Sequence, residues 1–398
     1  MKQNAIALEI SHRYIKILFG YVLGKQVVVS YAKKIPLNHP IENGVIKDRA
    51  SIIKELCKNN PLIDEEYHLS ELIDKVILVL PPYGLEVYQT KQITSVISPE
   101  KVVGELDVKN IYSIIRNKKL PIDNELIDII PDAFVLDNGE KYSLPPIGKE
   151  SSAITAYAKV HTLPSRINAE YTDCLKSSNI KIERRVVAPF ALSELLATYP
   201  DFPSTYYLVD IGANTTSISL IGKGQLFATR CFASGGDNIT DAIISTFNIS
   251  EQEAEKIKIL FGLDKREMKF DYSVYSSVVD DNKVSYSITA LNEIIENELD
   301  EFVKMFNVNL EQLNNIYNVV NYCELPIILV GGGSKLKGLV PYLKEHLSND
   351  NIELLKLKSI GARDTSFANL LGAILVNKKY PVAQDNASTT RVTVTREE

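Results

Sequence analysis

The chain has 398 residues, of which 24% are charged and 45% are hydrophobic, and its formal net charge is −6. This length exceeds a single typical core and predicts two domains, while the ordinary composition excludes wholesale disorder. The acidic balance argues against a general nucleic-acid binder, because neutralising phosphates needs a basic surface.

The N-terminal part of the chain predicts three strands, a helix and a buried strand. Short strands joined by tight turns are expected at residues 5–10, 14–22 and 26–32. A helix is expected at 48–58, where apolar residues recur at helical spacing. The continuous apolar run at 75–80 is typical of a strand that is buried on both faces.

The same order of elements recurs in the second half of the chain. Strands are expected near 206–211, 215–220 and 225–231, followed by a helix near 237–247 and a last strand at 326–330. Residues 8–11 align with 209–212, and residues 24–27 resemble 222–225. The chain is therefore predicted to be internally duplicated.

The turn that follows residues 206–211 carries the groups of most chemical interest. Asp210 lies at the end of a strand, and Gly212 lets backbone N–H groups approach an oxyanion. Asn214, Thr215 and Thr216 follow, and the two threonines add hydroxyl donors. We predict a phosphate cradle with magnesium bound to Asp210 through water, because this ion keeps several waters and often reaches protein through one carboxylate. An ordinary surface hairpin is the alternative.

Two stretches resemble motifs of the actin-like ATPase superfamily. DIGANTTSISL at 210–220 resembles its second phosphate motif, and VGGGSKLKGL at 330–339 resembles its adenosine motif. The resemblance implies that Gly331, Gly332, Gly333 and Lys335 belong to a nucleotide site. A helix that opens at these glycines and runs to about residue 347 is expected to add partial positive charge. The implied fold is α/β, with two duplicated, ribonuclease H-like domains of the actin-like kind that hold ATP and magnesium between them.

A longer run at 234–262, SGGDNITDAIISTFNISEQEAEKIKILFG, resembles the FtsA family of cell-division proteins. By this resemblance Gly235 and Gly236 belong to the nucleotide site. Glu255 and Lys258 stand one turn apart on one helical face, so both are expected to reach a ribose and its neighbouring phosphate. A solvated ion pair is the alternative interpretation of these two side chains.

The resemblance to FtsA extends from about residue 5 to about residue 378 and implies a domain organisation. Residues 87–161 resemble the small inserted FtsA-type subdomain, whose outer surface is expected to contact neighbouring molecules or other division proteins. Residues 184–195 and 367–376 resemble the elements at the hinge between the large domains. The first large domain is expected at 1–86, 162–197 and 359–380, the second at 198–358 with a smaller subdomain at about 248–320, and a disordered tail at 381–398.

The first hairpin departs from the family pattern, in which Asp-Ile-Gly is followed by Thr or Ser. This chain has Glu9, Ile10, Ser11 and His12 there. Ser11 carries a β-carbon that obstructs backbone approach to phosphate, and Glu9 is one methylene longer than Asp, so ATP binding without efficient turnover is expected. Both residues are still assigned to the nucleotide site. His12 and Arg13 could compensate as phosphate donors, although a basic pair at a turn is more often solvated.

The helix predicted at 290–306 departs from the family as well. Its apolar stripe is most simply a core face, and acidic residues cover the opposite face. The family usually presents an Arg near the position of Glu298, on the subdomain that receives the FtsZ tail. A carboxylate there would repel an acidic tail, so either the partner's charge has changed or the contact has moved. A merely solvated face is the alternative.

Cysteine usage and hydropathy indicate an intracellular protein. The four cysteines are far apart, with no CxxC and no clustered histidines, so neither a zinc site nor a disulfide framework is indicated and a reduced cytosol fits best. No apolar run reaches the ~18 residues of a membrane span, and residues 1–11 lack a signal-peptide core. The tail shows no amphipathic membrane helix, so recruitment to the division site or the inner face of the membrane is expected through partners.

The function that these resemblances imply is assembly and partner binding. We expect an FtsA-like protein that binds ATP and magnesium, self-associates into filaments or homo-oligomers, and links or organises FtsZ, with other division proteins as partners. It is expected to be at most a weak ATPase, and no catalytic residue is assigned. A PilM-like pilus assembly protein, which shares the insertion, is one alternative. A kinase-type enzyme of the same superfamily is the other, although no catalytic base is identified for it.

Overall fold

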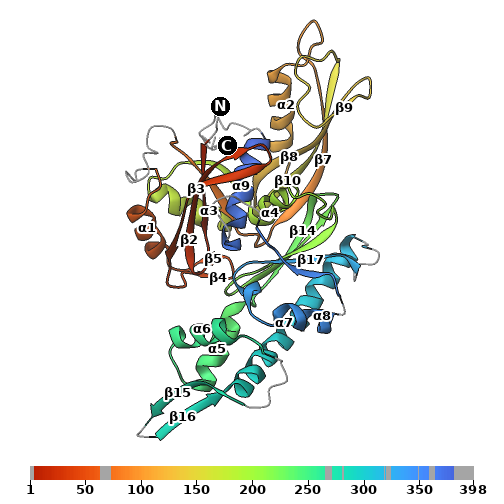
Figure 1. Cartoon of the computed structure of the whole chain (residues 1–398). Coiled ribbons are helices and arrows are strands. Elements are labelled where there is room, and N and C mark those ends of the chain that lie inside the picture. Colours follow the sequence, from red (N-terminus) through yellow and green to blue (C-terminus); the bar gives the residue numbers. More distant parts are fainter. Residues whose placement is uncertain are drawn as a thin grey trace, which may run out of the picture. The chain divides into compact units, whose positions relative to one another are not determined.

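The computed structural model describes residues 4–62, 73–264, 271–279, 282–317, 319, 324–347, 349–357 and 364–380 (Figure 1). The tail predicted at 381–398 lies outside these ranges, as does Cys323. The chain separates into two compact units. The larger unit comprises Met1–Val87, Leu120–Asp128 and His161–Lys378, and the smaller contains Tyr88–Lys119 and Ile129–Val160.

The first sheet of the larger unit has five strands in the order β11-β6-β1-β2-β3. Their bounds are Asn4–Ile10 (β1), Tyr14–Leu23 (β2), Gln26–Pro36 (β3), Val76–Leu80 (β6) and Ile182–Val187 (β11). β1 pairs antiparallel with β2 and parallel with β6. Every residue of β6 is buried, as its continuous apolar run predicts.

The second sheet repeats this topology in the order β14-β13-β12-β17-β18. Its strands are Tyr206–Ile211 (β12), Thr216–Gly222 (β13), Gln225–Phe232 (β14), Ile327–Val330 (β17) and Ile352–Leu354 (β18). β12 pairs antiparallel with β13 and parallel with β17, just as β1 pairs with β2 and β6. The internal duplication predicted from the sequence is therefore confirmed. We call the part of the larger unit built on each sheet the first and the second lobe.

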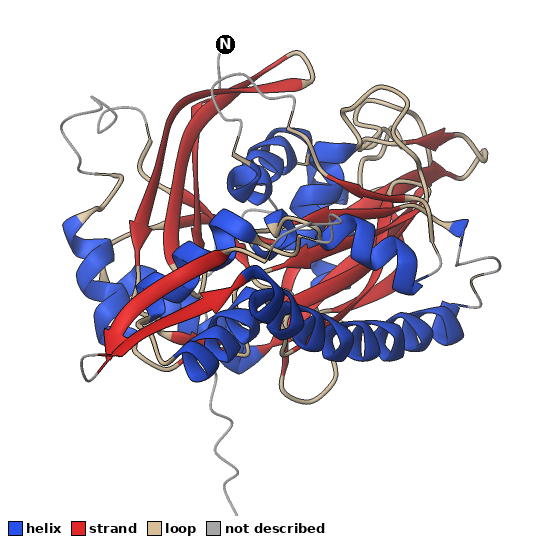
Figure 2. Ribbon diagram, turned by 60° about the horizontal axis from the view of Figure 1, so that its bottom comes forward, coloured by secondary structure: helices blue, strands red, loops and turns tan. Residues whose placement is uncertain are grey.

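Helices flank both sheets in an α/β arrangement (Figure 2). Those of the first lobe are Arg49–Lys58 (α1), Ser165–Ser177 (α3), Ala188–Leu196 (α4) and Ala368–Lys379 (α9). The predicted helices that connect the two lobes are α4 and α9, and they pack closely. A β-carbon on Gly372 of α9 would lie 1.9 Å from the Ala191 carbonyl oxygen of α4, so this crossing requires a glycine. The short strands Ile41–Glu42 (β4) and Val45–Ile46 (β5) form a separate hairpin.

The second lobe carries a layer of helices, and the buried face of one of them, α7, contains the apolar stripe predicted at 290–306. Its helices are Gly236–Phe247 (α5), Glu251–Phe261 (α6), Ile288–Tyr317 (α7) and Leu339–Leu347 (α8), beside the hairpin Ser273–Val279 (β15) and Asn282–Ser287 (β16). α7 is longer than predicted because buried apolar residues continue to Leu310 and Leu313.

The prediction of one helix from Gly333 to about residue 347 is wrong. The 3-10 turn Gly333–Lys335 (η3) ends at Leu336, and α8 begins only at Leu339. Between them the chain lies against residue Leu263, whose N–H donates to the Lys337 carbonyl. Gly338 has φ +82 and would place a β-carbon 2.2 Å from the Leu263 oxygen, so this contact interrupts the helix.

The smaller unit is built on a sheet of order β7-β10-β8-β9 with one helix. The elements are Glu86–Ser95 (β7), Asn124–Leu136 (β8), Lys141–Tyr142 (β9), Ala153–Pro164 (β10) and Glu105–Arg116 (α2). Asp107 fixes the start of α2, because its carboxylate accepts from the N–H groups of Ile97 and Gly104. None of the helices described here is long and apolar enough to cross a membrane.

Candidate functional site

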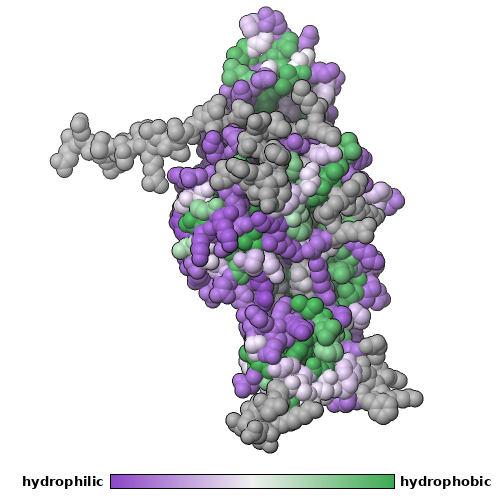
Figure 3. Space-filling model, turned by 60° about the vertical axis from the view of Figure 1, so that its left-hand side comes forward, coloured by the Kyte–Doolittle hydropathy of each residue, from purple (hydrophilic) through white to green (hydrophobic). Residues whose placement is uncertain are grey.

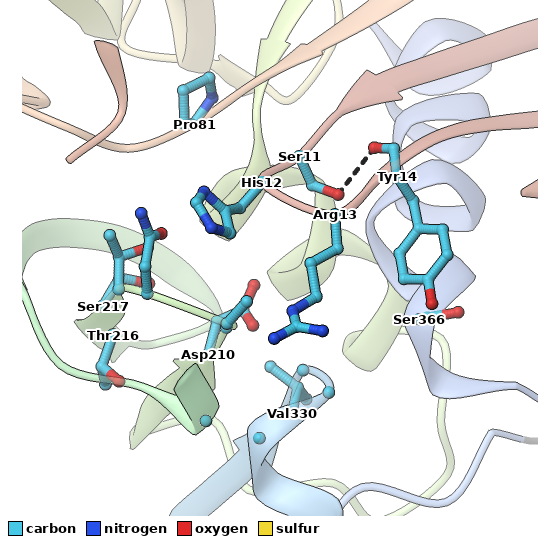
Figure 4. Close-up of a pocket in the computed structure, with 18 of the residues that line it drawn as sticks. Ser11, His12, Arg13, Tyr14, Pro81, Asp210, Thr216, Ser217, Val330 and Ser366 are labelled. Atoms are coloured by element: carbon cyan, nitrogen blue, oxygen red, sulfur yellow. Dashed lines mark hydrogen bonds between the residues drawn. The ribbon is translucent and has the colours of Figure 1, made fainter. Parts of the chain in front are cut away.

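A cleft of about 530 Å³ lies in the larger unit, where the ends of β1, β12 and β17 meet the start of α5 and one side of α6. Figure 4 shows Arg13 extending from the β1–β2 turn toward the side where Asp210 and Val330 lie, while the Ser11 hydroxyl points to Tyr14. The cleft is large enough for a nucleotide-sized ligand, since small-molecule sites commonly measure about 300–1,000 Å³.

The structure brings almost all of the predicted site residues together around this cleft. The residues that line it are Glu9, Ser11, Asp210, Gly212, Asn214, Thr215, Thr216, Gly236, Glu255, Lys258, Gly331, Gly332, Gly333 and Lys335. Gly235 lies just behind them. A β-carbon on Gly235 would lie 2.5 Å from the Ala213 carbonyl oxygen, so this glycine permits two loops to pack closely.

The two lobes place carboxylates at equivalent positions. Glu9 lies opposite Lys16 and beside Val79, and Asp210 lies opposite Ser217 and beside Val330. Burial, followed by the nearby charge of Glu9, raises the pKa of Asp210 despite the opposing influence of Lys16. A cation beside Asp210 would favour its charged form, which fits the predicted magnesium position.

Glu9 is tied to its own surroundings. Its Oε2 lies 3.0 Å from Lys16 Nζ, and its Oε1 accepts a hydrogen bond of 3.0 Å from Asn369 Nδ2. Glu9 therefore contributes charge at the cleft while its side chain is fixed by neighbours.

The glycines after β17 have different surroundings. Gly331 has φ +87, and a β-carbon there would lie 2.3 Å from both Asp210 Oδ1 and the Ile211 carbonyl oxygen. A β-carbon on Gly332 would meet no atom within 4 Å. Gly331 is therefore required for the close approach to Asp210, whereas Gly332 presents bare backbone to open space in the cleft.

The two equivalent turns are closed by the same hydrogen bond. Gly212 N donates to Thr215 O at 2.8 Å, and Ser11 N donates to Tyr14 O at 2.9 Å. The Ser11 hydroxyl also donates to Tyr14 O at 2.8 Å (Figure 4). The first turn thus has the geometry of the second, but it carries a side chain where the second has only glycine.

Two of the predicted polar contacts go to the protein instead. The Thr216 hydroxyl donates to Ser234 O at 2.7 Å, and Asn214 Nδ2 donates to Ile41 O at 3.2 Å. The expectation that both threonine hydroxyls point at a phosphate therefore does not hold for Thr216, which is buried. The sequence gave no indication of this hydrogen bond, because its acceptor Ser234 lies 18 positions further along the chain, in the loop between β14 and α5.

Glu255 and Lys258 are not a simple solvated pair. Lys258 Nζ lies 2.6 Å from Glu255 Oε2 and donates to Gly236 O at 2.8 Å and Thr240 Oγ1 at 2.7 Å. The Lys258 side chain is only 9% exposed. The ion pair therefore joins α6 to the start of α5 at the wall of the cleft.

Arg13 connects the two lobes. Its Nε donates to Asp237 Oδ1 at 2.9 Å, and its Nη2 contacts the same oxygen and lies 3.3 Å from Glu251 Oε1. Burial alone would raise the pKa of Asp237, but contacts with His12 and Arg13 outweigh it and lower that pKa to about 2. The expectation of a solvated basic pair is thus wrong. Asp237 gave no signal in the sequence, because an acid in the first turn of a helix is common.

A second connection between the lobes passes through Asp364. Lys335 Nζ lies 2.7 Å from Asp364 Oδ1, and Lys34 of β3 pairs with the other oxygen. The neighbouring Thr365 and Ser366 line the cleft, and their buried hydroxyl groups have no hydrogen-bond partner within the part of the chain that the structure describes. These hydroxyls are candidate ligand contacts that sequence reasoning missed.

The duplicated sheets and the cleft between them define an actin-like fold. The PilM-PilN type IV pilus biogenesis complex has the same fold, with a TM-score of 0.61 and 20% identity, covering 93% of this chain and 97% of that chain. MreB 5 of Spiroplasma citri bound to AMPPNP aligns with a TM-score of 0.54 and 13% identity, covering 95% and 97%. The predicted fold class is confirmed.

Within this class the chain is similar to FtsA. Residues 207–372 match the family model described as cell division protein FtsA. Cell division protein FtsA of Enterococcus faecalis is 24% identical over 376 residues, which are 93% of this chain and 82% of the relative. The FtsA of Bacillus subtilis is 21% identical, with 93% and 82% covered. The resemblance to FtsA that the sequence motifs indicated is confirmed.

Proposed function

We propose that the chain binds ATP with magnesium in the cleft, self-associates, and links or organises FtsZ at the division site. The main observation in support of ATP binding is the position of Asp210 beside the backbone of Gly331 and Gly332. One glycine fits tightly against the carboxylate, and the next leaves a flat, open surface. This combination suits a hydrated cation beside a planar ring system.

Bound ATP and magnesium would supply a polyanion and its counter-ion, and the chain's own residues have distinct tasks around them. Asp210 holds the ion's water shell, with Glu9 adding charge from the equivalent position. Gly332 offers backbone to the base, and Glu255 with Lys258 stands where a ribose and its neighbouring phosphate are expected. The buried hydroxyl groups of Thr365 and Ser366 supply further donors.

We expect turnover to be slow. Ser11 carries a β-carbon and a hydroxyl that is already bonded to Tyr14 O, so the first turn cannot approach a phosphate as a glycine turn does. Glu9 is held by Lys16 and Asn369, which leaves it poorly placed to activate a water molecule. The protein would therefore work through binding and assembly, as an adaptor in the cytoplasm.

The smaller unit carries the surface we assign to self-association or to other division proteins. Hydrophobic residues are gathered on this part of the surface, as seen at the top of Figure 3. Its exposed large hydrophobic residues include Ile93, Ile97, Leu106, Ile114, Leu144 and Ile147. An accumulation of this kind is typical of a protein-interaction surface.

The acidic side of α7 bears on the FtsZ contact. Glu298 is half-buried, and burial together with the charges of Glu301 and Asp241 raises its pKa. A carboxylate under such repulsion gains from a cationic neighbour, so we expect a partner segment docked here to carry basic residues rather than a purely acidic tail.

Cosedimentation with FtsZ tests this proposal. With ATP and magnesium, the wild-type chain should pellet together with FtsZ polymers, and the Asp210→Ala variant should bind ATP more weakly. A chain that binds ATP but stays in the supernatant at all FtsZ concentrations would contradict the proposed FtsZ interaction and leave the proposed ATP binding standing.

A PilM-like role is the second candidate, and the likeness of fold to the PilM-PilN complex is the observation that favours it. A pull-down of the chain on immobilised PilN, carried out beside the FtsZ cosedimentation, separates the two. Retention of the chain by PilN without any interaction with FtsZ would favour the pilus function.

A further inference from the structure

Two imidazoles and one carboxylate from separate segments meet beside the cleft. His12 lies in the β1–β2 turn, His39 precedes the β4–β5 hairpin, and Asp237 lies in the first turn of α5. Their potential ligand atoms all lie within 4.8 Å of one another, and the two imidazole centroids are 4.7 Å apart. We propose that these three residues bind a divalent transition-metal ion of the zinc class, which holds the two lobes together.

The hydrogen bonding of His12 fixes the direction of its free nitrogen. Nδ1 of His12 is bonded to the Ile41 carbonyl, and a carbonyl only accepts, so Nδ1 carries the proton. In the neutral ring Nε2 then presents a lone pair, and it lies 3.2 Å from Asp237 Oδ2. Two electron-rich atoms at this distance need either a proton on Nε2 or a metal cation between them. The Nδ1 bond to a backbone carbonyl is also the arrangement that typically orients a metal-bound histidine.

Asp237 has one oxygen available for this purpose. Arg13 occupies Oδ1, while Oδ2 is buried and accepts no hydrogen bond from the residues that the structure describes. The side chains of His12 and Asp237 are each only 14% exposed, so water cannot readily compensate these atoms. The unpartnered oxygen therefore faces the lone pair of His12.

His39 completes the cluster in a strained conformation. Its φ is +48, although it precedes Pro40, a position that favours extended backbone. Strain of this kind in a non-glycine residue is often retained for function. Its Nε2 lies 3.2 Å from Glu251 Oε1, so Glu251 or water could supply a fourth ligand.

The distances and the ligand types favour zinc over magnesium. Two ligand atoms bound to one tetrahedral zinc ion at ~2.0–2.1 Å lie about 3.3 Å apart, close to the 3.2 Å between His12 Nε2 and Asp237 Oδ2. Imidazole nitrogen suits zinc, copper or nickel, whereas magnesium prefers oxygen. The local carboxylates also outnumber the local cations. The carboxylates are Asp237, Glu251 and Glu255, and the cations are Arg13 and Lys258.

This inference goes beyond the proposed nucleotide site, because the ion would join the lobes without ATP. His12 and Ile41 belong to the first lobe, and Asp237 belongs to the second. We therefore expect zinc to stabilise the nucleotide-free chain.

The test is a zinc titration of the full chain, stripped of metal and nucleotide, against a chromophoric zinc indicator. All variants carry Cys57→Ser, because Cys57 is an exposed thiol that could bind zinc by itself. One equivalent should bind to the parent protein. His12→Ala and His39→Ala should each weaken binding at least tenfold, while the control His346→Ala, in α8, should not change it.

Thermal unfolding gives a second measurement. Zinc should raise the Tm of the parent and of His346→Ala, but not that of His39→Ala, whose change lies in an exposed loop and should leave the fold intact. Equal zinc affinity in parent and His39→Ala would overturn the site. A parent chain that binds no zinc but is stabilised by acidification would assign the space between His12 and Asp237 to a proton, and would also overturn it.

Discussion

Adding one methyl group to each of two adjacent glycines should separate the fold of the cleft from its ligand binding. In Gly331→Ala the new β-carbon lies 2.3 Å from Asp210 Oδ1 and from the Ile211 carbonyl oxygen, at φ +87. The left-handed conformation costs roughly 1–2 kcal/mol, and overpacking against backbone adds about 1–3 kcal/mol. We expect Gly331→Ala to lose about 2–5 kcal/mol of unfolding free energy.

Gly332→Ala is the matched control. Gly332 has φ −68 and ψ −42, which alanine adopts readily, and its β-carbon meets no atom within 4 Å. Replacing such a glycine should stabilise the nucleotide-free chain by ~0.4–1 kcal/mol. The methyl group nevertheless enters the space assigned to the base, so ATP affinity should fall at least tenfold.

Urea unfolding followed by circular dichroism measures the first effect, and titration with a fluorescent ATP analogue measures the second. A parent-like urea midpoint for Gly331→Ala would refute the required close approach of Gly331 to Asp210. A folded Gly332→Ala variant that binds ATP with unchanged affinity would show that the base lies elsewhere.

Three further changes test other parts of the site and the smaller unit. Asp210→Asn should weaken magnesium-dependent ATP binding, and unchanged ATP affinity would contradict this. The same change should raise the urea midpoint without nucleotide at pH 7, because the raised pKa of the Asp210 carboxyl makes its charge costly once the pH exceeds the ordinary value of 3.8. Although burial opposes it, contacts with Lys335 and Lys34 lower the pKa of Asp364, so its stabilisation is present above pH 3.8 and is lost as the pH falls through the lowered value. Asp364→Asn should cost about 1 kcal/mol at pH 7 after solvent screening, and melts down to pH 3 should show the difference shrinking. Replacing Tyr88–Lys119 and Ile129–Val160 each by a short linker, which keeps Leu120–Asp128 of the larger unit, should preserve ATP binding and abolish sedimentable filaments, and loss of both would place the insertion in the core.

The two turns at the ends of β1 and β12 show how a duplicated fold diverges. Both are closed by the same backbone hydrogen bond, so the fold does not require glycine at residue 11. Asp210 and Gly212 keep the features expected for a cation and a phosphate, whereas Glu9 and Ser11 bond to their own lobe. We infer that the second lobe contributes most of the ligand contacts.

Elements governed by local periodicity were predicted well from the sequence. The helix α1 and eight strands of the two sheets, including the buried strand β6, follow from apolar spacing and turn residues, which act over a few positions along the chain. The strand β11 was indicated only by the family resemblance, and the short strand β18 was not predicted. The order of these elements revealed the duplication, and the motifs around Asp210 and Gly331 indicated the cleft. Domain bounds and nucleotide contacts stay predictions.

Tertiary structure alone decided which polar groups meet. The helix expected after Gly333 is interrupted because Lys337 pairs with Leu263, a residue from another element. The 224 positions between Arg13 and Asp237 leave no periodic signal of their contact. The same holds for His12 and His39, which are unclustered in sequence but come together at the cleft. Local patterns specify elements, whereas contacts between lobes depend on how the sheets, turns and helices pack in three dimensions.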